Sequence, residues 1–356
     1  AVIKNAEEDV TANYTVTKTP GTLNIIKSAI ENYINIYPVD VTEVYNGEAH
    51  AAGTATASDR NGNVLKIEYS VNGTDWTEDP SEITATNVSE STTVNVRVST
   101  ENYDGYVTGT EKLTITPATL TVSTPTVTRV YEGTPLTAAG TISGFVNGET
   151  ATFTTTGSQT EVGSTANTYS LTWDGTAKES NYKVVETIGT LTVTAQSIDP
   201  DNPNYKGITV DAPTAVEYTG ADQTWLPTVT DGNGKALVKD TDYTVTYDNE
   251  DRTNVTGTIT VTINGAGNYA GTITRTYQIT PKPITITTES KTRAFDGTAL
   301  TAGGKVEGIV SGETYGFKTT GSQTYVGSSQ NTYEMVWADS EVEGTSGTYT
   351  AKKTNY

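Results

Sequence analysis

Few side chains in this sequence could do covalent or metal chemistry. The chain has no cysteine, one histidine (His50) and one methionine (Met335). The lack of cysteine excludes disulfides, thiolate metal sites and cysteine nucleophiles, and a single histidine excludes HExxH-type zinc sites. A Ser–His–Asp triad could use only His50, which we interpret as an exposed loop residue. We therefore expect no enzyme activity.

One acidic string could bind a metal ion. Asp199-Pro200-Asp201-Asn202-Pro203-Asn204 offers several hard oxygen ligands of the kind that Ca²⁺ prefers. The candidate ligands are Asp199, Asp201 and Asn204, and they would stiffen the junction of two repeats. The alternative, which we favour, is a solvated linker stiffened by proline, with no cofactor at all. A second string, Asp248–Asp251, is interpreted as a hairpin turn.

The overall charge limits the partners of this chain. Its 356 residues carry 22 basic and 42 acidic side chains, for a formal net charge of −20. Nucleic acid and anionic membrane surfaces both need clustered Lys and Arg, so neither is expected as a partner. No apolar run approaches ~18 residues, so we expect no membrane insertion. Abundant Thr, Val, Ile, Tyr and Gly favour β-structure.

Two short markers recur along the chain. The first marker is the dipeptide Asn-Tyr, whose tyrosines are spaced 89, 79, 87 and 87 residues apart: Tyr14, Tyr103, Tyr182, Tyr269 and Tyr356. An aromatic residue two positions before a glycine recurs at Tyr45, Tyr131, Tyr218 and Phe295. Four tandem units follow from these markers. Two units are close relatives, because residues 127–173 and 291–337 are identical at 27 of 47 positions.

Each unit alternates apolar and polar residues. The alternation is clearest at residues 65–71, 94–98, 243–247, 258–263 and 283–288, and it predicts strands with one buried face. Asn-Gly and Asp-Gly turn signals separate the strands. The pattern predicts an all-β protein, a tandem array of antiparallel, Ig-like β-sandwich modules. β-grasp modules are the alternative, and the one helix-like stretch lies near residues 27–32.

Aromatic residues and prolines suggest how the modules are built and joined. Each unit has one tryptophan, which we interpret as a core anchor rather than a platform for an aromatic ligand: Trp76, Trp173, Trp225 and Trp337. Pro117 and Pro281 lie inside extended runs that end one unit and begin the next. Such short joints favour an elongated rod.

The close pair of units resembles a known family. Residues 131–136, 156–160, 181–184 and 189–193 are similar to the MBG/YDG-type repeats of large bacterial cell-surface adhesins, and residues 295–356 resemble the same module. The other two units look like companion modules of such proteins. The resemblance implies an extracellular, non-catalytic stalk on a bacterial cell surface, with an unknown ligand on a host or neighbouring cell.

Two further expectations come with this resemblance. Adhesin stalks carry intramolecular cross-links, for which Gln159 and Gln323 stand at matching positions, although bonds to the local backbone are the simpler interpretation. A carbohydrate- or glycoprotein-binding module, with tyrosines in loops as the binders, is the alternative function.

The chain is out of phase with its own modules by one strand. Asn-Tyr precedes the last strand of each unit, so residues 1–26 supply an orphan strand, whereas the unit that ends at Asn355-Tyr356 lacks one. Either the chain is a slice of a longer protein, or strands are added head-to-tail between molecules to form a filament. The candidate residues for strand exchange are Tyr14, Val16, Leu23, Ile25, Asn355 and Tyr356. The predicted boundaries are 1–26 (orphan strand), 27–117, 118–195 (MBG type), 196–281 and 282–356 (MBG type).

Overall fold

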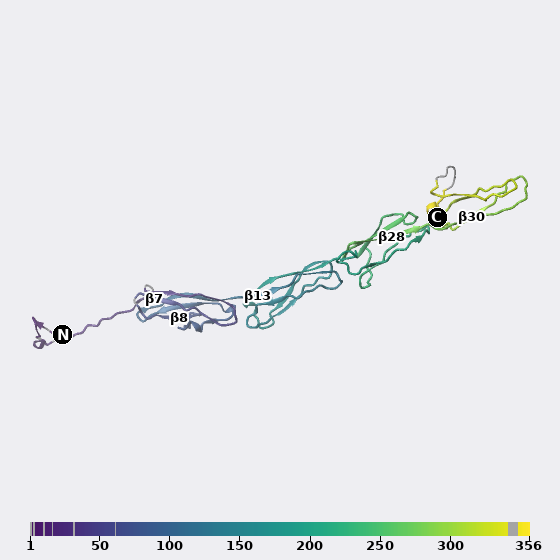
Figure 1. Ribbon diagram of the computed structural model, residues 1–356. Helices are drawn as coiled ribbons and strands as arrows, with labels where there is room; N and C mark the ends of the chain where they lie inside the picture. Colours follow the sequence, from purple (N-terminus) through teal and green to yellow (C-terminus); the bar gives the residue numbers. More distant parts are fainter. Residues whose placement is uncertain are drawn as a thin grey trace. The chain divides into compact units, whose positions relative to one another are not determined.

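The computed structural model describes residues 2, 4–9, 11–15, 17–30, 33–60, 62–340 and 348–356 (Figure 1). Strands and short 3-10 helices are the regular elements of this described part, which confirms the all-β prediction. The chain divides into two compact units. Unit 1 comprises Ala1–Ser123, Gly140–Thr154 and Tyr169–Thr187, and unit 2 comprises Thr124–Ala139, Thr155–Thr168 and Ile188–Tyr356. The four module boundaries stay predictions.

The first part of unit 1 is organised around a four-stranded sheet. Its order is β5 (Val41–Val44), β12 (Val107–Thr116), β10 (Thr92–Ser99) and β8 (Lys66–Ser70). β10 is antiparallel to β12 and β8, whereas β5 is parallel to β12. Smaller pairs complete this part: β3 (Ser28–Ala29) with β11 (Tyr103–Asp104), β4 (Ile34–Tyr37) with β7 (Thr56–Asp59), and β6 (His50–Ala51) with β9 (Thr84–Ala85).

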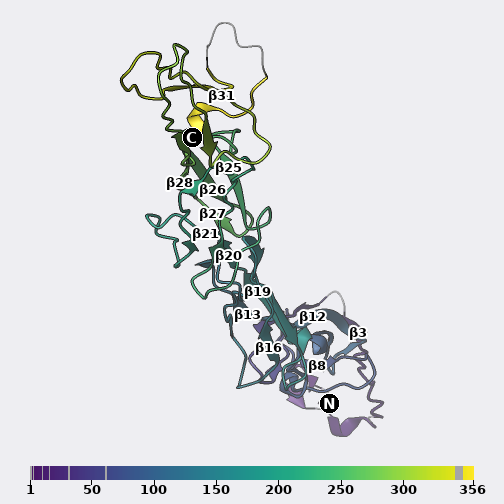
Figure 2. The same cartoon turned by 90° about the vertical axis from the view of Figure 1, so that its right-hand side faces the viewer.

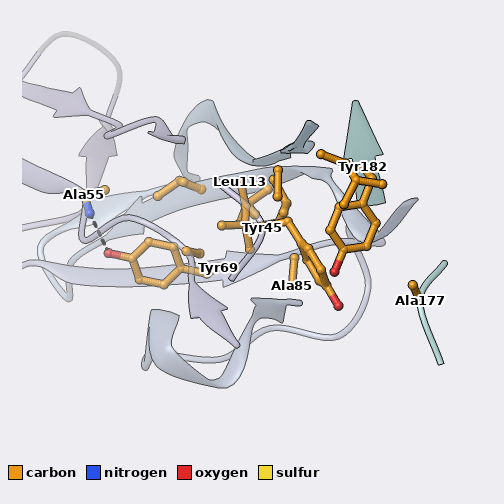
Figure 3. Packing of buried hydrophobic residues seen from close by; sticks show 13 residues of the cluster. Tyr45, Ala55, Tyr69, Ala85, Leu113, Ala177 and Tyr182 are labelled. Atoms are coloured by element: carbon orange, nitrogen blue, oxygen red, sulfur yellow. Dashed lines mark hydrogen bonds between the residues drawn. The ribbon is translucent and has the colours of Figure 1, made fainter. Parts of the chain in front are cut away.

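The core of this part follows from the predicted alternation. In β10, Val94, Val96 and Val98 are fully buried, while the residues between them face outward. Tyr69 of β8 is also buried, and its hydroxyl accepts a 2.9 Å hydrogen bond from the backbone N–H of Ala55 (Figure 3). This bond satisfies a backbone donor that would otherwise be lost inside the core.

Unit 1 also holds strands from the middle of the chain. β13 (Ala118–Ser123) lies between β15 (Thr141–Ser143), which is antiparallel to it, and β19 (Tyr182–Thr187), which is parallel. β13 and β19 are labelled side by side in Figure 2. β16 (Thr152–Thr155) pairs with β18 (Tyr169–Thr172). Pro117 separates β12 from β13, as expected for a residue that cannot donate to a ladder. The remaining elements are β1 (Lys4–Asn5), β2 (Glu8–Asp9), η1 (Thr11–Asn13), η3 (Pro80–Glu82), η4 (Val88–Glu90) and η5 (Glu179–Asn181).

Unit 2 repeats the same pairing logic. β20 (Thr190–Thr194) lies between β14 (Val127–Val130), which is parallel to it, and β17 (Gly163–Ala166), which is antiparallel. A four-stranded sheet follows in the order β23 (Val216–Glu217), β28 (Thr272–Thr280), β26 (Thr258–Gly265) and β25 (Tyr243–Tyr247). Its smaller pairs are β21 (Gln196–Ser197) with β27 (Tyr269–Ala270) and β22 (Thr209–Val210) with β24 (Val229–Thr230).

The last part of unit 2 has fewer paired strands. β29 (Thr285–Thr288) pairs with β30 (Gly304–Glu307), β31 (Gly316–Thr319) pairs with β32 (Tyr333–Val336), and η6 (Lys353–Asn355) follows. The counterparts of β14 and β17, at residues 291–294 and 327–330, have no strand structure.

Several expectations are corrected by the structure. In the helix-like stretch at residues 27–32, Ser28–Ala29 form strand β3, and residues 31 and 32 lie outside the described residues. No α-helix occurs in the described ranges, which removes the β-grasp alternative there. His50 is a half-buried strand residue rather than an exposed loop residue, and its Nε2 lies 2.9 Å from Asn46 Oδ1.

One tryptophan and the supposed linker also differ from expectation. Trp337 is buried, and Trp173 and Trp225 pack partly buried against cores, as predicted. Trp76 instead stacks with Arg97, whose guanidinium carbon lies 4.0 Å from the centroid of the Trp76 ring. The acidic string at Asp199 follows the fully buried Ile198 and strand β21, so it is a loop of the folded unit rather than a free linker.

The predicted orphan strand at the start of the chain is not formed. Residues 17–27 are exposed and belong to no strand in the described part of the chain, after the short β1–β2 hairpin. Strands obtain their hydrogen bonds from neighbours, so a segment with strand-like alternation stays irregular until a partner edge is available.

A tyrosine substitution tests the buried bond in the first core. Tyr69→Phe should lower the free energy of unfolding by about 1–3 kcal/mol, because the Ala55 N–H loses its hydroxyl acceptor while remaining buried. The matched control is Tyr37→Phe, at a ring that is 54% exposed, and it should change little. Urea unfolding followed by tryptophan fluorescence measures both, and equal effects would contradict the assignment.

Candidate functional site: the tyrosine–glutamate clasp

Tyr45 and Tyr182 of unit 1 meet at one carboxylate. The hydroxyl of Tyr45 donates to Oε1 of Glu149 at 2.7 Å, and the hydroxyl of Tyr182 donates to Oε2 of the same side chain. The two rings are edge-to-face, with centroids 5.6 Å apart and planes at 80° (Figure 3). We call this arrangement of two tyrosines and one glutamate a clasp.

Regular backbone pairing positions each member of this clasp. Tyr45 directly follows β5, and its N–H donates to the carbonyl of Thr116 at 2.8 Å. Tyr182 is the first residue of β19 and lies opposite Ala118 in the register. The N–H of Glu149 donates to the carbonyl of Val146 at 2.9 Å in a tight turn. The clasp therefore joins sequence that precedes Pro117 to sequence that follows it.

Asn181 adds a second connection beside the clasp. Its side chain is fully buried, and its Oδ1 accepts from the N–H of Val88 at 3.0 Å. Its Nδ2 donates to Oδ1 of Asn87 at 2.7 Å. An amide can fill both roles because it carries an acceptor and two donors. Trp173 stacks on the ring of Tyr182, with ring centroids 5.9 Å apart.

Unit 2 contains a second clasp with the same geometry. Tyr218 and Tyr356 both donate to Glu313, the latter at 2.5 Å, and their rings are edge-to-face with centroids 5.5 Å apart. The N–H of Val310 donates to the Tyr356 hydroxyl at 2.9 Å, as that of Val146 does to Tyr182 at 3.0 Å in unit 1. Trp337 stacks on Tyr356 with centroids 5.8 Å apart.

Asn355 repeats the role of Asn181. It is buried, its Oδ1 accepts from the N–H of Val255 at 2.9 Å, and its Nδ2 donates to Oδ1 of Asn254 at 2.8 Å. Asp251 shapes the receiving loop, since its Oδ1 accepts from the N–H of Asn254. The string Asp248–Asp251 lies in the loop between the antiparallel strands β25 and β26, as the hairpin interpretation predicts.

A variant without a central glutamate also occurs in unit 2. Tyr131 and Tyr269 are edge-to-face with centroids 5.7 Å apart. Asn268 Oδ1 accepts from the N–H of Val162 at 2.9 Å, and Nδ2 donates to Glu161. The asparagine and the aromatic pair are thus common to the three sites, whereas the bridging carboxylate is not.

Burial and hydrogen bonding raise the pKa values of the tyrosine hydroxyls at these sites. Loss of solvent, followed by the bond to a glutamate, raises the pKa of Tyr182 and of Tyr218 to about 12. The same two causes raise the pKa of Tyr356, and burial raises that of Tyr269 to about 12. The hydroxyls therefore stay protonated and act as donors at neutral pH.

Sequence reasoning used these residues as repeat markers and missed their pairing. The signal was present in the spacing, because the paired tyrosines are 137, 138 and 138 residues apart: Tyr45 with Tyr182, Tyr131 with Tyr269, and Tyr218 with Tyr356. The glutamates could have been found in the shared Gly-Glu-Thr at Glu149 and Glu313.

The candidate calcium ligands form a local turn. Asp199 Oδ1 accepts from the N–H of Asp201 at 3.0 Å, and the N–H of Asn204 donates to Oδ1 of Asn202 at 2.9 Å. Among the residues that the structure describes, no group of three or more His, Cys, Asp or Glu could hold a metal ion. Calcium binding stays a prediction.

The other predicted residues fall into two groups. Gln159 and Gln323 each donate Nε2 to a backbone carbonyl two residues later, at 2.7 Å, which is the local bonding that the simpler interpretation describes. Of the strand-exchange candidates, Asn355 and Tyr356 lie in the second clasp. Val16 lies outside the described residues. The remaining three candidates are exposed: Tyr14 at 60%, Leu23 at 99% and Ile25 at 101%.

Alkaline pH should open the clasps. Tyrosine in an unfolded chain ionises near pH ~10, and Tyr182 and Tyr218 ionise at about 12 in the folded state. A raised folded pKa stabilises the fold fully below about pH 10, and this stabilisation is lost as the pH rises to about 12. Urea unfolding at stepped pH should show a fall of up to about 2–3 kcal/mol for each tyrosine. Tyr182→Phe should reduce the fall, and an unchanged slope would contradict the assignment.

The asparagine contacts give a separate prediction. Asn355→Ala should cost about 1–3 kcal/mol of unfolding free energy, because Val255 N–H loses its acceptor. Asn355→Asp keeps the acceptor and loses the donor to Asn254, so it should cost less. Hydrogen exchange at the Val255 amide should accelerate in the alanine variant only. Equal protection in both variants would refute the role.

Comparisons with known proteins complete the description of the site. No curated protein matches the chain. Among solved structures, the I-band fragment I67–I69 from titin is 12% identical with a TM-score of 0.26, covering 69% of this chain and 97% of that one. Drosophila OTK extracellular domains 3–5 are 11% identical, TM-score 0.20, covering 72% and 99%. Drosophila N-cadherin EC1-4 is 11% identical, TM-score 0.19, covering 70% and 76%.

No helix among the described residues is long and apolar enough to cross a membrane.

The comparison with protein families gives a match to one segment of the chain. Residues 120–192, which include Glu149, Asn181 and Tyr182, match the family described as MBG domain (YGX type), and this confirms the predicted resemblance for that segment.

Proposed function

We propose that this chain is a non-catalytic stalk segment of an extracellular bacterial surface protein, which spaces or presents a binding region. The match of residues 120–192 to the MBG domain family supports an adhesin-like setting. The observation that carries the proposal is the clasp, which recurs in both units with the same partners. A stalk needs successive repeats that do not swing freely, and each clasp ties one repeat to the next.

The chemistry of the clasp suits mechanical coupling. Each carboxylate receives two hydroxyl donors, and each asparagine receives a backbone N–H, so several bonds must break together before the joined segments separate. Hydrogen bonds to a charged acceptor are stronger than neutral ones, contributing about 1.5–3 kcal/mol each. The edge-to-face ring pairs add about 0.5–1.5 kcal/mol each.

Small-angle X-ray scattering tests the stalk proposal. The intact chain should give a maximum dimension well above that of a compact sphere of 37.7 kDa. Glu149→Ala with Glu313→Ala should broaden the distance distribution, because four tyrosine hydroxyls lose their acceptors and the joints loosen. Glu132→Ala, at an exposed glutamate outside the clasps, is the control. A compact profile, or no difference between the variants, would contradict the proposal.

A further inference from the structure

A groove opens in the last part of unit 2. It has a volume of about 560 Å³, and its walls come from residues 289–296, 298, 300–302 and 321–331. Large apolar side chains along it are left in solvent, with Phe295 at 63%, Tyr325 at 77% and Val326 at 92% exposure. We call it the acceptor groove.

The related MBG-type repeat shows what such a groove holds. There, residues 127–130 (β14) and 163–166 (β17) lie on either side of β20 and pair with it. The same positions in the later copy are 291–294 and 327–330, which line the acceptor groove and have no strand structure. The groove therefore lies where β20 lies in the related repeat.

The side chains of β20 define the required occupant. Leu191 and Val193 are buried at 0% and 2%, and they form a small core with Leu136. The carbonyl of Thr194 accepts from the N–H of Tyr131 at 2.8 Å. In the later copy, Leu136 is replaced by Leu300, which is half-buried, and Tyr131 by Phe295, which is exposed. The groove fits a strand that carries two apolar residues at alternate positions.

The chain itself contains a segment with that pattern. Residues 21–25 read Gly-Thr-Leu-Asn-Ile, and residues 189–193 read Gly-Thr-Leu-Thr-Val. Both glycines follow the tyrosine of an Asn-Tyr pair by 7 residues: 21 − 14 and 189 − 182. The equivalent glycine positions in the other two units do not share this Gly-Thr-Leu sequence.

This segment is also exposed to solvent. Leu23, Ile25 and Ile26 are exposed at 99%, 101% and 85%, in an extended stretch that belongs to no strand of the described chain. Three apolar side chains held in solvent lower their free energy when a neighbouring sheet covers them. No proline lies between residues 21 and 27, so every residue of the segment can donate to a ladder.

We propose that residues 21–26 of one copy insert as a strand into the acceptor groove of a second copy. The register of β20 places the inserted strand parallel to residues 291–294 and antiparallel to residues 327–330. Leu23 then takes the buried position of Leu191, and Ile25 that of Val193. The donor and the groove are different surfaces, so the contact is head-to-tail and repeats from copy to copy. The inference goes beyond the stalk proposal and does not depend on it.

Engineered cysteines can trap this register, since the chain has no other thiol. In the related repeat, Ser164 lies opposite Thr192, and their hydroxyls are 2.9 Å apart. The equivalent intermolecular pair is Ser328 and Asn24. A chain carrying Asn24→Cys should form a disulfide-linked heterodimer with a tagged chain carrying Ser328→Cys. Ser329→Cys, one residue out of register, is the matched control and should cross-link much less.

Assembly in solution is the second readout. Light scattering over a concentration series should show growing oligomers of the unmodified chain. Leu23→Asp with Ile25→Asp should weaken assembly more than about tenfold, because two carboxylates would have to be buried. Thr19→Asp, outside the inserted strand, is the control. A peptide of residues 15–27 should bind the Leu23→Asp, Ile25→Asp chain, whose groove is intact.

Four results would overturn the proposal. The first is a chain that stays monomeric and gives no heterodimer. The second is a cross-link that forms equally in and out of register. The third is the persistence of oligomers in the double aspartate variant. The fourth is a disulfide within one chain when Asn24→Cys and Ser328→Cys are combined at high dilution, which would show that the groove takes its own chain's segment.

Discussion

The structure depends on a carboxylate that is shared between two tyrosine hydroxyls. A carboxylate that is partly removed from water is stabilised by hydrogen-bond donors, and in each clasp the half-buried glutamate, Glu149 or Glu313, accepts one tyrosine hydroxyl on each of its two oxygens. If either hydroxyl leaves, the glutamate loses one of these two donors. In the clasp of unit 1, Tyr45 follows the edge strand β5 and Tyr182 begins β19 beyond Pro117, so Glu149 connects two ladders within that unit.

The three sites vary around a constant asparagine. Asn181, Asn268 and Asn355 each accept a hydrogen bond from the backbone N–H of a valine. At the site of Tyr131 and Tyr269 the central carboxylate is missing, and Glu161 instead accepts from the asparagine. A side-chain amide tolerates such exchange because it offers an acceptor on one side and donors on the other. An ionised aspartate, which only accepts, could not supply both.

The sequence predicted those features that depend on neighbouring residues. The alternation at residues 94–98 predicted a strand with three buried valines, and Pro117 and Pro281 marked the strand changes. It did not show that Tyr45 meets Tyr182, because a contact over 137 residues leaves no local pattern and only the repeated spacing of the tyrosines points to it. It also misplaced His50, whose strand partner in β9 lies more than thirty residues away. Short strands are defined by their partners rather than by their own composition.

The same reasoning explains why two similar segments differ in structure. Residues 21–25 and 189–193 share three identical residues in the same order, yet only the second segment is a strand. The difference is the edge beside it: β20 has β14 and β17 as neighbours. The counterpart edges at residues 291–294 and 327–330 are themselves irregular, and each shares two of its four residues with β14 or β17. In the related repeat β14 and β17 pair with β20 rather than with each other, so each outer strand depends on the strand between them.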